Sequence, residues 1–159
     1  MRAYFFILFL IAIFCNTSYS ISNKYTIDSD SQLILSNGNI KSIGNVHAVS
    51  GDMIIKSDEA TYHQDNPKNI FITAVGNPIK YAGITEDGKP FSGNSKKFKY
   101  IPKTGEMILI GEAFIQQNEN TLSAELINYN VITKKMTASA APNKRVRSVF
   151  YPEGLPQKK

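Results

Sequence analysis

The chain has 159 residues, with 18 Lys and Arg against 13 Asp and Glu, and its formal net charge is +5. A positive charge favours an acidic partner, such as a phosphorylated surface. The single cysteine, Cys15, excludes an internal disulfide, and two histidines without further cysteines exclude a conventional zinc site.

The first 20 residues have the features of a cleaved secretory signal peptide. Arg2 precedes an unbroken apolar run of 13 residues, 3–15, and Ser18 and Ser20 supply the small residues of a cleavage site. The run is too short to span a bilayer, which needs ~20 residues. We therefore predict a signal peptide at residues 1–20 and one mature domain at residues 21–159, with an ordered core at about 24–152 and a basic C-terminal tail. An exported domain without cysteine suits a bacterial periplasm and excludes a cytosolic enzyme.

After residue 24 the pattern is typical of β-structure. Short runs rich in Ile, Val, Thr, Tyr and Phe recur, and no helical spacing of apolar residues is sustained. Turn signals built from Gly, Asn, Asp and Pro separate these runs about every 8–12 residues. In chain order, the predicted turns lie at residues 37–39, 44–45, 50–52, 65–67, 76–78, 86–88, 102–105 and 111. The sequence therefore predicts an all-β sandwich or roll.

An internal repeat is the most informative feature of the chain. Residues 43–62 align without gaps on residues 110–129, and residues 95–100 hold a third copy of the strand core. The shared pattern is small-x-x-apolar-x-Tyr, and its copies end at Tyr62, Tyr100 and Tyr129. Glycines 32 and 35 residues apart open successive units, at Gly44, Gly76 and Gly111. A period of this size, made only of strands, predicts stacked β-hairpins around one interior.

Alternation along the strands predicts which side chains face that interior. Phe98 and Tyr100 share a face with Lys96, whereas Lys97 and Lys99 take the other face. By alternation and by the repeat, the interior also receives Ala60, Tyr62, Met107, Leu109, Ala113, Ile115, Ile127 and Tyr129. Each of these residues is most simply explained as core. Together they leave open a second interpretation, in which part of the interior is a slot for a long apolar ligand.

No arrangement of residues predicts catalysis, a metal site or a cofactor. Residues 83–90 nearly match the phosphate-binding P-loop, but Pro90 replaces the Ser or Thr that binds Mg²⁺, and we predict a hairpin loop there. The carboxylates are scattered among turns, and no spacing indicates a Ser-His-Asp triad. Solvated strand faces explain most of the basic residues, and a rim for phosphate groups of a ligand explains the rest. No nucleic-acid-binding module is recognisable, so we predict neither an enzyme nor a nucleic-acid partner.

An ordered set of short motifs runs through the mature chain in one register. Its segments are Tyr25–Asp30, Gly38–Ile40, Gly44–Val46, Ile55–Ala60, Gly76–Pro78, Asp87–Gly93, Leu109–Gln117, Lys135–Met136 and Lys144–Val146. This set resembles the LptA/OstA-like family of periplasmic lipopolysaccharide-transport bridge proteins, over roughly residues 24–152. The chain departs from the family pattern at Glu112, where an Asn is usual.

The resemblance implies an open antiparallel β-jelly roll, V-shaped in section, with an apolar groove between two sheets. It implies that the groove shields the acyl chains of lipid A while the sugars stay in water. Family members stack head to tail and bridge an inner-membrane complex to the outer-membrane translocon. Alternation and the family match together assign lipid contacts to Tyr25, Ile27, Tyr62, Tyr81, Phe98, Tyr100, Leu109, Ile115 and Ile127.

Two β-rich runs, one near each end of the chain, have no evident partner inside the repeats. We expect them to pair between copies, through Tyr25, Ile27, Val146, Ser148 and Phe150. The expected partners are therefore lipopolysaccharide, the inner-membrane-anchored and outer-membrane components of the transport machinery, and further copies of the chain. Two alternatives stay open: the membrane-tethered sister module of the same system, and an exported carbohydrate-binding β-domain. The short N-terminal apolar run argues against the first, and the lack of Trp argues against the second.

Overall fold

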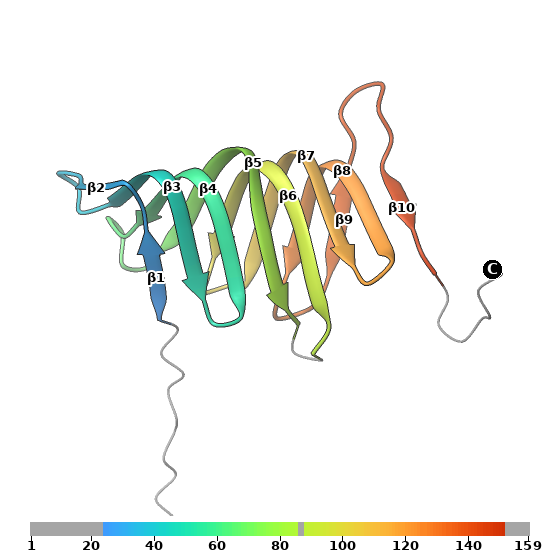
Figure 1. Ribbon diagram of the computed structural model, residues 1–159, viewed down its shortest axis with the longest axis horizontal. Helices are drawn as coiled ribbons and strands as arrows, with labels where there is room; N and C mark the ends of the chain where they lie inside the picture. Colours follow the sequence, from blue (N-terminus) through green and yellow to red (C-terminus); the bar gives the residue numbers. More distant parts are fainter. Residues whose placement is uncertain (1–23, 86–87, 152–159) are drawn as a thin grey trace, which may run out of the picture.

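The computed structural model describes residues 24–85 and 88–151, and these residues form ten β-strands and no helix (Figure 1). The strands are β1 (Tyr25–Asp28), β2 (Ser31–Ile34), β3 (Ile40–Ser50), β4 (Met53–His63), β5 (Phe71–Ile84), β6 (Pro90–Ile101), β7 (Glu106–Gln117), β8 (Asn120–Asn130), β9 (Met136–Ser139) and β10 (Arg147–Val149). Their antiparallel order is β1-β3-β4-β5-β6-β7-β8-β10, while β2 pairs with β3 and β9 with β8. The all-β prediction is confirmed. The predicted signal peptide and residues 152–159 of the basic tail lie outside the described residues.

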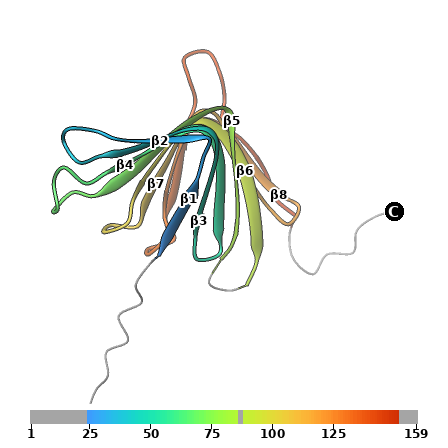
Figure 2. The same ribbon diagram turned by 60° about the vertical axis from the view of Figure 1, so that its left-hand side comes forward.

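The long central strands bend in the middle, so that the sheet folds into two arms that meet at a vertex (Figure 2). The pairing register shifts at each bend: between Ile43 and Val46 in β3, Lys56 and Glu59 in β4, Val75 and Ile79 in β5, Asn94 and Lys97 in β6, and Ile110 and Ala113 in β7. One arm begins with β2 and ends with β9, and we call it the β2/β9 arm. The other begins with β1 and ends with β10, and we call it the β1/β10 arm. The result is an open, V-shaped β-jelly roll.

Three of the predicted turns lie at these bends. Gly44-Asn45 lies within β3, residues 76–78 lie within β5, and Gly111 lies within β7, so the expectation that they reverse the chain is wrong. Gly111 has a φ of +81° and Glu112 a φ of +49°, in the left-handed region that glycine adopts readily. Such a pair in the middle of a strand makes a bulge, which redirects the strand from one arm into the other without ending it.

Alternation across a bend fails for Lys96. Because the register shifts between Asn94 and Lys97, Ser95 is buried while Lys96 lies on the surface. There the Lys96 Nζ atom lies 2.8 Å from the Glu112 carboxylate. The prediction that Lys96 shares the inner face with Phe98 and Tyr100 is therefore wrong.

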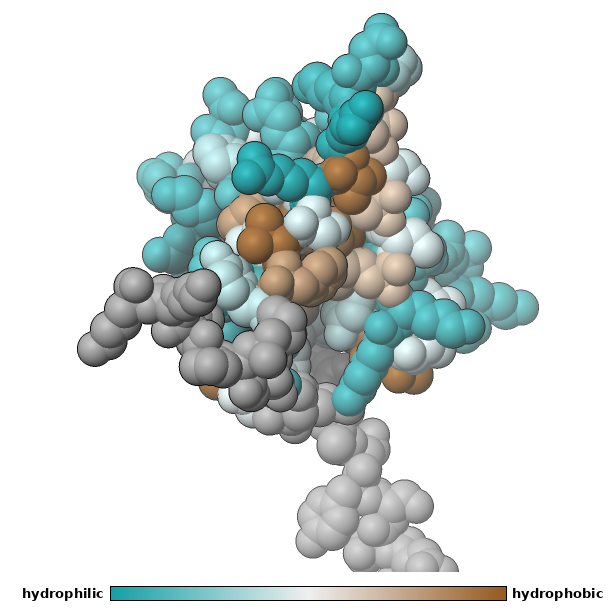
Figure 3. All heavy atoms as spheres, turned by 90° about the vertical axis from the view of Figure 1, so that its right-hand side faces the viewer, coloured by the Kyte–Doolittle hydropathy of each residue, from teal (hydrophilic) through white to brown (hydrophobic). Residues whose placement is uncertain are grey.

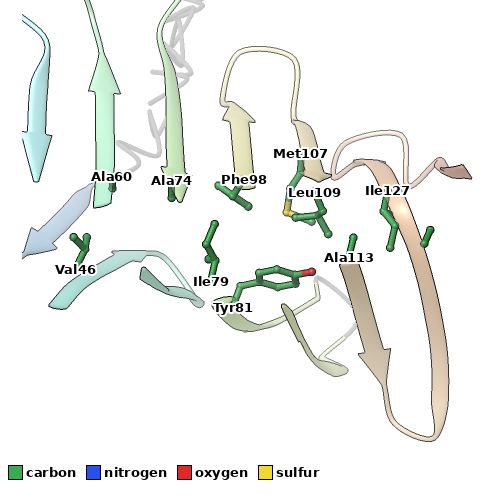
Figure 4. Close-up of a cluster of buried hydrophobic side chains, with 11 residues drawn as sticks. Val46, Ala60, Ala74, Ile79, Tyr81, Phe98, Met107, Leu109, Ala113 and Ile127 are labelled. Carbon is green, nitrogen blue, oxygen red and sulfur yellow. The ribbon is translucent and has the colours of Figure 1, made fainter. Parts of the chain in front are cut away.

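The core fills the angle between the two arms (Figure 4). One cross-strand row on the β2/β9 arm contains Ala60, Ala74, Phe98, Leu109 and Ile127. It faces the buried residues of the β1/β10 arm, namely Val46, Ile79, Tyr81, Ala113 and Ala124. The small residues that open the three copies of the repeat, Ser57, Ser95 and Ala124, are all buried beside the bends. Alternation within each arm therefore predicts the core correctly.

Hairpin loops close the arms at their open edges. Ile84 pairs with Pro90 across the loop that resembles a P-loop, and the Thr85 N–H donates to the Lys89 carbonyl at 2.9 Å. The hairpin prediction for this segment is confirmed. Within the described ranges, no helix is long and apolar enough to cross a membrane, and no three potential metal ligands gather in one place.

Candidate ligand-binding groove

The open side of the V holds a groove between the inner faces of the two arms. A cavity of about 580 Å³ extends from Tyr25 and Ile27 on β1 to Tyr129 on β8. A second cavity of about 320 Å³ continues it to Phe150, directly after β10. The two cavities share the lining residues Thr85, Phe91, Met107, Gln117, Tyr129 and Lys134, so we treat them as one groove. This groove runs from the first strand of the β1/β10 arm to the last.

The lining of the groove is mainly apolar. Both arms contribute to it, with side chains that include Ile27, Met53, Ile72, Phe91, Met107, Ile115 and Leu122. Among the described residues that line it, only Asp52 and Lys134 are charged, and both lie in connections between strands. An apolar interior with charge only at its edges suits a ligand with long apolar chains and a polar end.

The predicted lipid-contact residues divide into two groups. Tyr25, Ile27 and Tyr100 line the first cavity and Ile115 lines the second, while the Tyr62 ring lies 6.5 Å from that of Tyr25. The other four are at most 3% exposed and form the floor beneath the lining: Tyr81, Phe98, Leu109 and Ile127. The floor residues support the groove, and contact with a ligand stays a prediction for the first group.

Burial keeps three tyrosines, one beneath the groove and two in its lining, in the neutral form. Burial raises the pKa of Tyr81, whose hydroxyl donates to the main-chain carbonyl of Phe114 at 2.8 Å. Burial also raises the pKa of Tyr100, and burial together with Tyr100 raises that of Tyr25. Tyr25, Tyr81 and Tyr100 are therefore uncharged hydrogen-bonding groups at neutral pH.

Comparison with known proteins decides the family. The family model described as "LptA/(LptD N-terminal domain) LPS transport protein" matches residues 26–135, which is more than half of the chain. The chain belongs to this family. The resemblance inferred from the sequence motifs is confirmed. Because the family consists of transport proteins, the prediction that the chain is not an enzyme is confirmed as well.

Curated relatives and a solved structure agree with this assignment. The chain is 29% identical over 136 residues to "Lipopolysaccharide export system protein LptA" of Escherichia coli K12, covering 83% of this chain and 73% of that protein. The protein of the same name from Haemophilus influenzae is 24% identical over 143 residues, covering 87% and 83%. The crystal structure of LptH from Pseudomonas aeruginosa superposes with a TM-score of 0.74 at 22% identity, over 82% of this chain and 96% of LptH. The LptH match confirms the open β-jelly-roll fold.

Several lining residues of this LptA-family groove were not among the predicted contacts. Ile72 and Met107 are the register partners of Tyr100 on its two sides. Alternation had already placed Met107 in the interior, whereas Ile72 could be found only from the strand pairing. Phe91 lies seven positions before Phe98, and strict alternation therefore assigns it to the outer face. The shift between Asn94 and Lys97 reverses that assignment and brings Phe91 into the groove.

The predicted interface residues lie at the two ends of the family's jelly roll. Tyr25 and Ile27 are on β1, which pairs with β3, and Ser148 is on β10, which pairs with β8. The expectation that these two runs have no partner inside the repeats is therefore wrong, because each pairs with a strand of a repeat. Val146 and Phe150 flank β10. β1 and β10 stand at the two ends of the strand order, so each is an edge of the sheet.

Apolar side chains are exposed at both ends. On β2, at the N-terminal end, Leu33 is 50% and Ile34 80% exposed. At the C-terminal end, Phe150 is 73% and Met136 43% exposed. Figure 3 shows apolar residues gathered in the middle of this end face, inside a hydrophilic periphery. The interior of the roll is thus open to contact at its ends as well as along its side.

Proposed function

We propose that the chain is a periplasmic lipopolysaccharide carrier, exported by a signal peptide at residues 1–20, whose groove shields the acyl chains of lipid A. The sugars of the lipid protrude through the open side of the V. Membership of an LPS-transport family supports this proposal, as do relatives named for lipopolysaccharide export. LptH is described as the periplasmic component of a lipopolysaccharide transport device, which supports the location.

The observation that carries the proposal is the form of the groove: apolar, open along one side and continuous between the two ends. Burying one methylene group is worth ~0.8 kcal/mol, so a ~12-carbon acyl chain in water costs ~10 kcal/mol. A lipid with several such chains cannot cross an aqueous space unshielded. A groove that is open along its side covers the chains and leaves room for sugars of any length.

The proposal includes a bridge of stacked copies. If β10 of one copy pairs with β1 of the next copy, the β1/β10 arms of the two copies form one continuous sheet. In the same contact, β9 of the first copy meets β2 of the second. The groove therefore continues from copy to copy. The surfaces that meet are different, so the contact does not close on itself and gives an open filament. The inner-membrane-anchored and outer-membrane components of the machinery are the partners expected at the two ends.

Photo-crosslinking tests the binding proposal at two neighbouring residues. Tyr100 lines the groove, whereas Lys99 points to the outer face, with its Nζ 4.5 Å from the Phe71 ring centre. A photoreactive residue in place of Tyr100 should capture lipopolysaccharide, and one in place of Lys99 should capture little. Equal labelling at the two positions would contradict the groove as the binding site. N-terminal sequencing of the exported protein, with Ile21 as the expected first residue, tests the signal peptide.

A further inference from the structure

The inner face of the β2/β9 arm carries a tyrosine on every second strand. Tyr62 on β4, Tyr100 on β6 and Tyr129 on β8 lie in one cross-strand row, and Ile72 on β5 and Met107 on β7 occupy the positions between them. Since neighbouring strands lie ~4.8 Å apart, the tyrosines recur about every 10 Å along the groove. We call these three residues the tyrosine row.

The tyrosine row lies where the apolar floor ends and the open side begins. Two residues deeper, Ala60, Phe98 and Ile127 are at most 4% exposed, whereas the tyrosines are only partly buried. One residue beyond the tyrosines, the strands end at His63, Ile101 and Asn130. The three rings therefore stand at the boundary between the apolar interior and water, where an amphipathic side chain is most stable.

The hydroxyl groups of the tyrosine row are available to a ligand. None of the three donates or accepts a hydrogen bond within the part of the chain that the structure describes. Tyr81 differs, because its hydroxyl lies 2.8 Å from the Phe114 carbonyl and 3.1 Å from that of Asn94. Partly buried tyrosine hydroxyls usually find a partner, and here the partner has to come from the groove or from water.

One part of a lipid suits a hydroxyl group at the boundary between the apolar floor and water, namely the polar end of its acyl chains. An acyl chain that lies on the apolar floor carries, at its polar end, the ester or amide carbonyl that joins it to the head group. A tyrosine hydroxyl donates one hydrogen bond and suits such an oxygen. Ile72 and Met107, between the tyrosines, offer apolar side chains and no hydroxyl group. Along the groove, the positions at this boundary therefore alternate between a tyrosine hydroxyl and an apolar side chain. An acyl chain that enters the groove passes one of these positions.

We propose that the tyrosine row binds the ester and amide carbonyl oxygens that join acyl chains to the head group, and so sets the depth at which the lipid lies. This inference rests on the proposed function and adds to it the residues and the lipid group that they recognise. A neutral hydrogen bond contributes about two- to tenfold in affinity, so no single tyrosine holds the lipid firmly. Equivalent sites about 10 Å apart allow the lipid to advance from one to the next.

The test removes the three hydroxyls and keeps the three rings. The variant Tyr62→Phe/Tyr100→Phe/Tyr129→Phe is compared with the natural chain, with Tyr100→Phe alone, and with Tyr151→Phe, a control outside the tyrosine row. Affinity is measured for lipopolysaccharide, for a diacyl phosphatidylcholine, and for diphenylhexatriene, a hydrocarbon probe without a hydrogen-bond acceptor. We expect the triple variant to lose roughly tenfold or more for both lipids. Tyr100→Phe should lose about two- to tenfold, and the probe should bind all variants equally.

Each other outcome overturns the inference in a distinguishable way. Unchanged lipid affinity in the triple variant would show that the hydroxyls do not contact the ligand. A parallel loss for the hydrocarbon probe would show that the groove itself had changed shape. A loss for lipopolysaccharide but not for the phospholipid would assign the hydroxyls to sugars instead of acyl carbonyls. If the natural chain bound the probe but not lipopolysaccharide, the proposed function itself would fail.

Discussion

Tyr81 and Gly93 face each other directly across β5 and β6, and the tyrosine ring occupies the space that a side chain at position 93 would fill. A Cβ atom on Gly93 would lie 2.8 Å from Tyr81 Cζ, too close for real atoms. The ring thus passes over the backbone of β6, and its hydroxyl reaches the Phe114 carbonyl on β7. One side chain therefore connects three strands in the floor of the groove.

Replacing Tyr81 by Phe removes this connection and keeps the ring. We expect the free energy of unfolding to fall by about 1 kcal/mol, because a buried neutral hydrogen bond is lost. Urea unfolding measures the change, and the slope of the transition should stay constant. Tyr151→Phe removes an exposed hydroxyl and should change stability by less than about 0.5 kcal/mol. Equal midpoints for the natural chain and Tyr81→Phe would show that the bond contributes nothing.

The bend in β7 depends on Gly111. At φ +81° an alanine is strained, and its Cβ would also lie 2.9 Å from the Lys96 Cβ. Gly38 has a similar φ of +85° but open space around it, so Gly38→Ala isolates the backbone strain. We expect a loss of about 1 kcal/mol for Gly38→Ala and about 2–3 kcal/mol for Gly111→Ala, by urea unfolding. If Gly111→Ala lost no more unfolding free energy than Gly38→Ala, the Lys96 side chain would have to move aside without cost, and the predicted clash would be refuted.

His63 makes the stability of the roll depend on pH. The Asn39 Oδ1 atom accepts from the N–H groups of Gln64 and Asp65, so its Nδ2 donates to His63 Nδ1 at 3.3 Å. Since His63 Nδ1 accepts this hydrogen bond, the Nε2 atom carries the proton and the ring is neutral. His63 Nε2 lies 2.9 Å from the Thr73 hydroxyl. Burial lowers the pKa of His63, with nearby Lys99 acting in the same direction and Asp65 against it.

Because the folded-state pKa is below the unfolded value of ~6.5, the unfolded chain binds a proton more tightly. Neutral His63 therefore makes its full contribution to the free energy of unfolding above about pH 6.5. This contribution falls as the pH drops toward the folded-state pKa. Urea midpoints between pH 7.5 and 5 should therefore decline more for the natural chain than for His63→Gln. His47→Gln should behave like the natural chain. An NMR titration that places the His63 pKa above 6.5 would refute this account.

Self-association should depend on the exposed edge strand β2. Ile34 is 80% exposed there, and a charge at a sheet edge opposes pairing with another copy. We expect the natural chain to form assemblies that grow with concentration, and we expect Ile34→Lys to remain a monomer at the same concentrations, as measured by light scattering. Ile54→Lys is the matched control, since Ile54 is 40% exposed on β4, away from the ends. Undiminished growth of the Ile34→Lys variant would exclude β2 from the contact.

The sequence by itself determined the strands, the repeat and the core residue of each repeat. Ala60, Phe98 and Ile127 are buried as alternation predicts, because period two follows from the local geometry of a strand. The small-x-x-apolar-x-Tyr pattern likewise placed the three tyrosines on one inner face. The ordered motifs indicated the family, which the matching family model confirms.

Only the tertiary structure decided where alternation stops. A Gly-Asn or Gly-Glu pair suits either a hairpin turn or a mid-strand bulge, and the choice depends on which residues the neighbouring strands pair with. The bulges at Gly44 and Gly111 bend the sheet. The register shift between Asn94 and Lys97, opposite the Gly111 bulge, transfers Lys96 to the surface and brings Phe91 into the groove. Alternation and the family match together assigned Tyr81 to the groove. Its burial in the floor depends on Gly93 and Phe114, which lie on other strands. Contacts of this kind form between strands, so no pattern within a single strand predicts them.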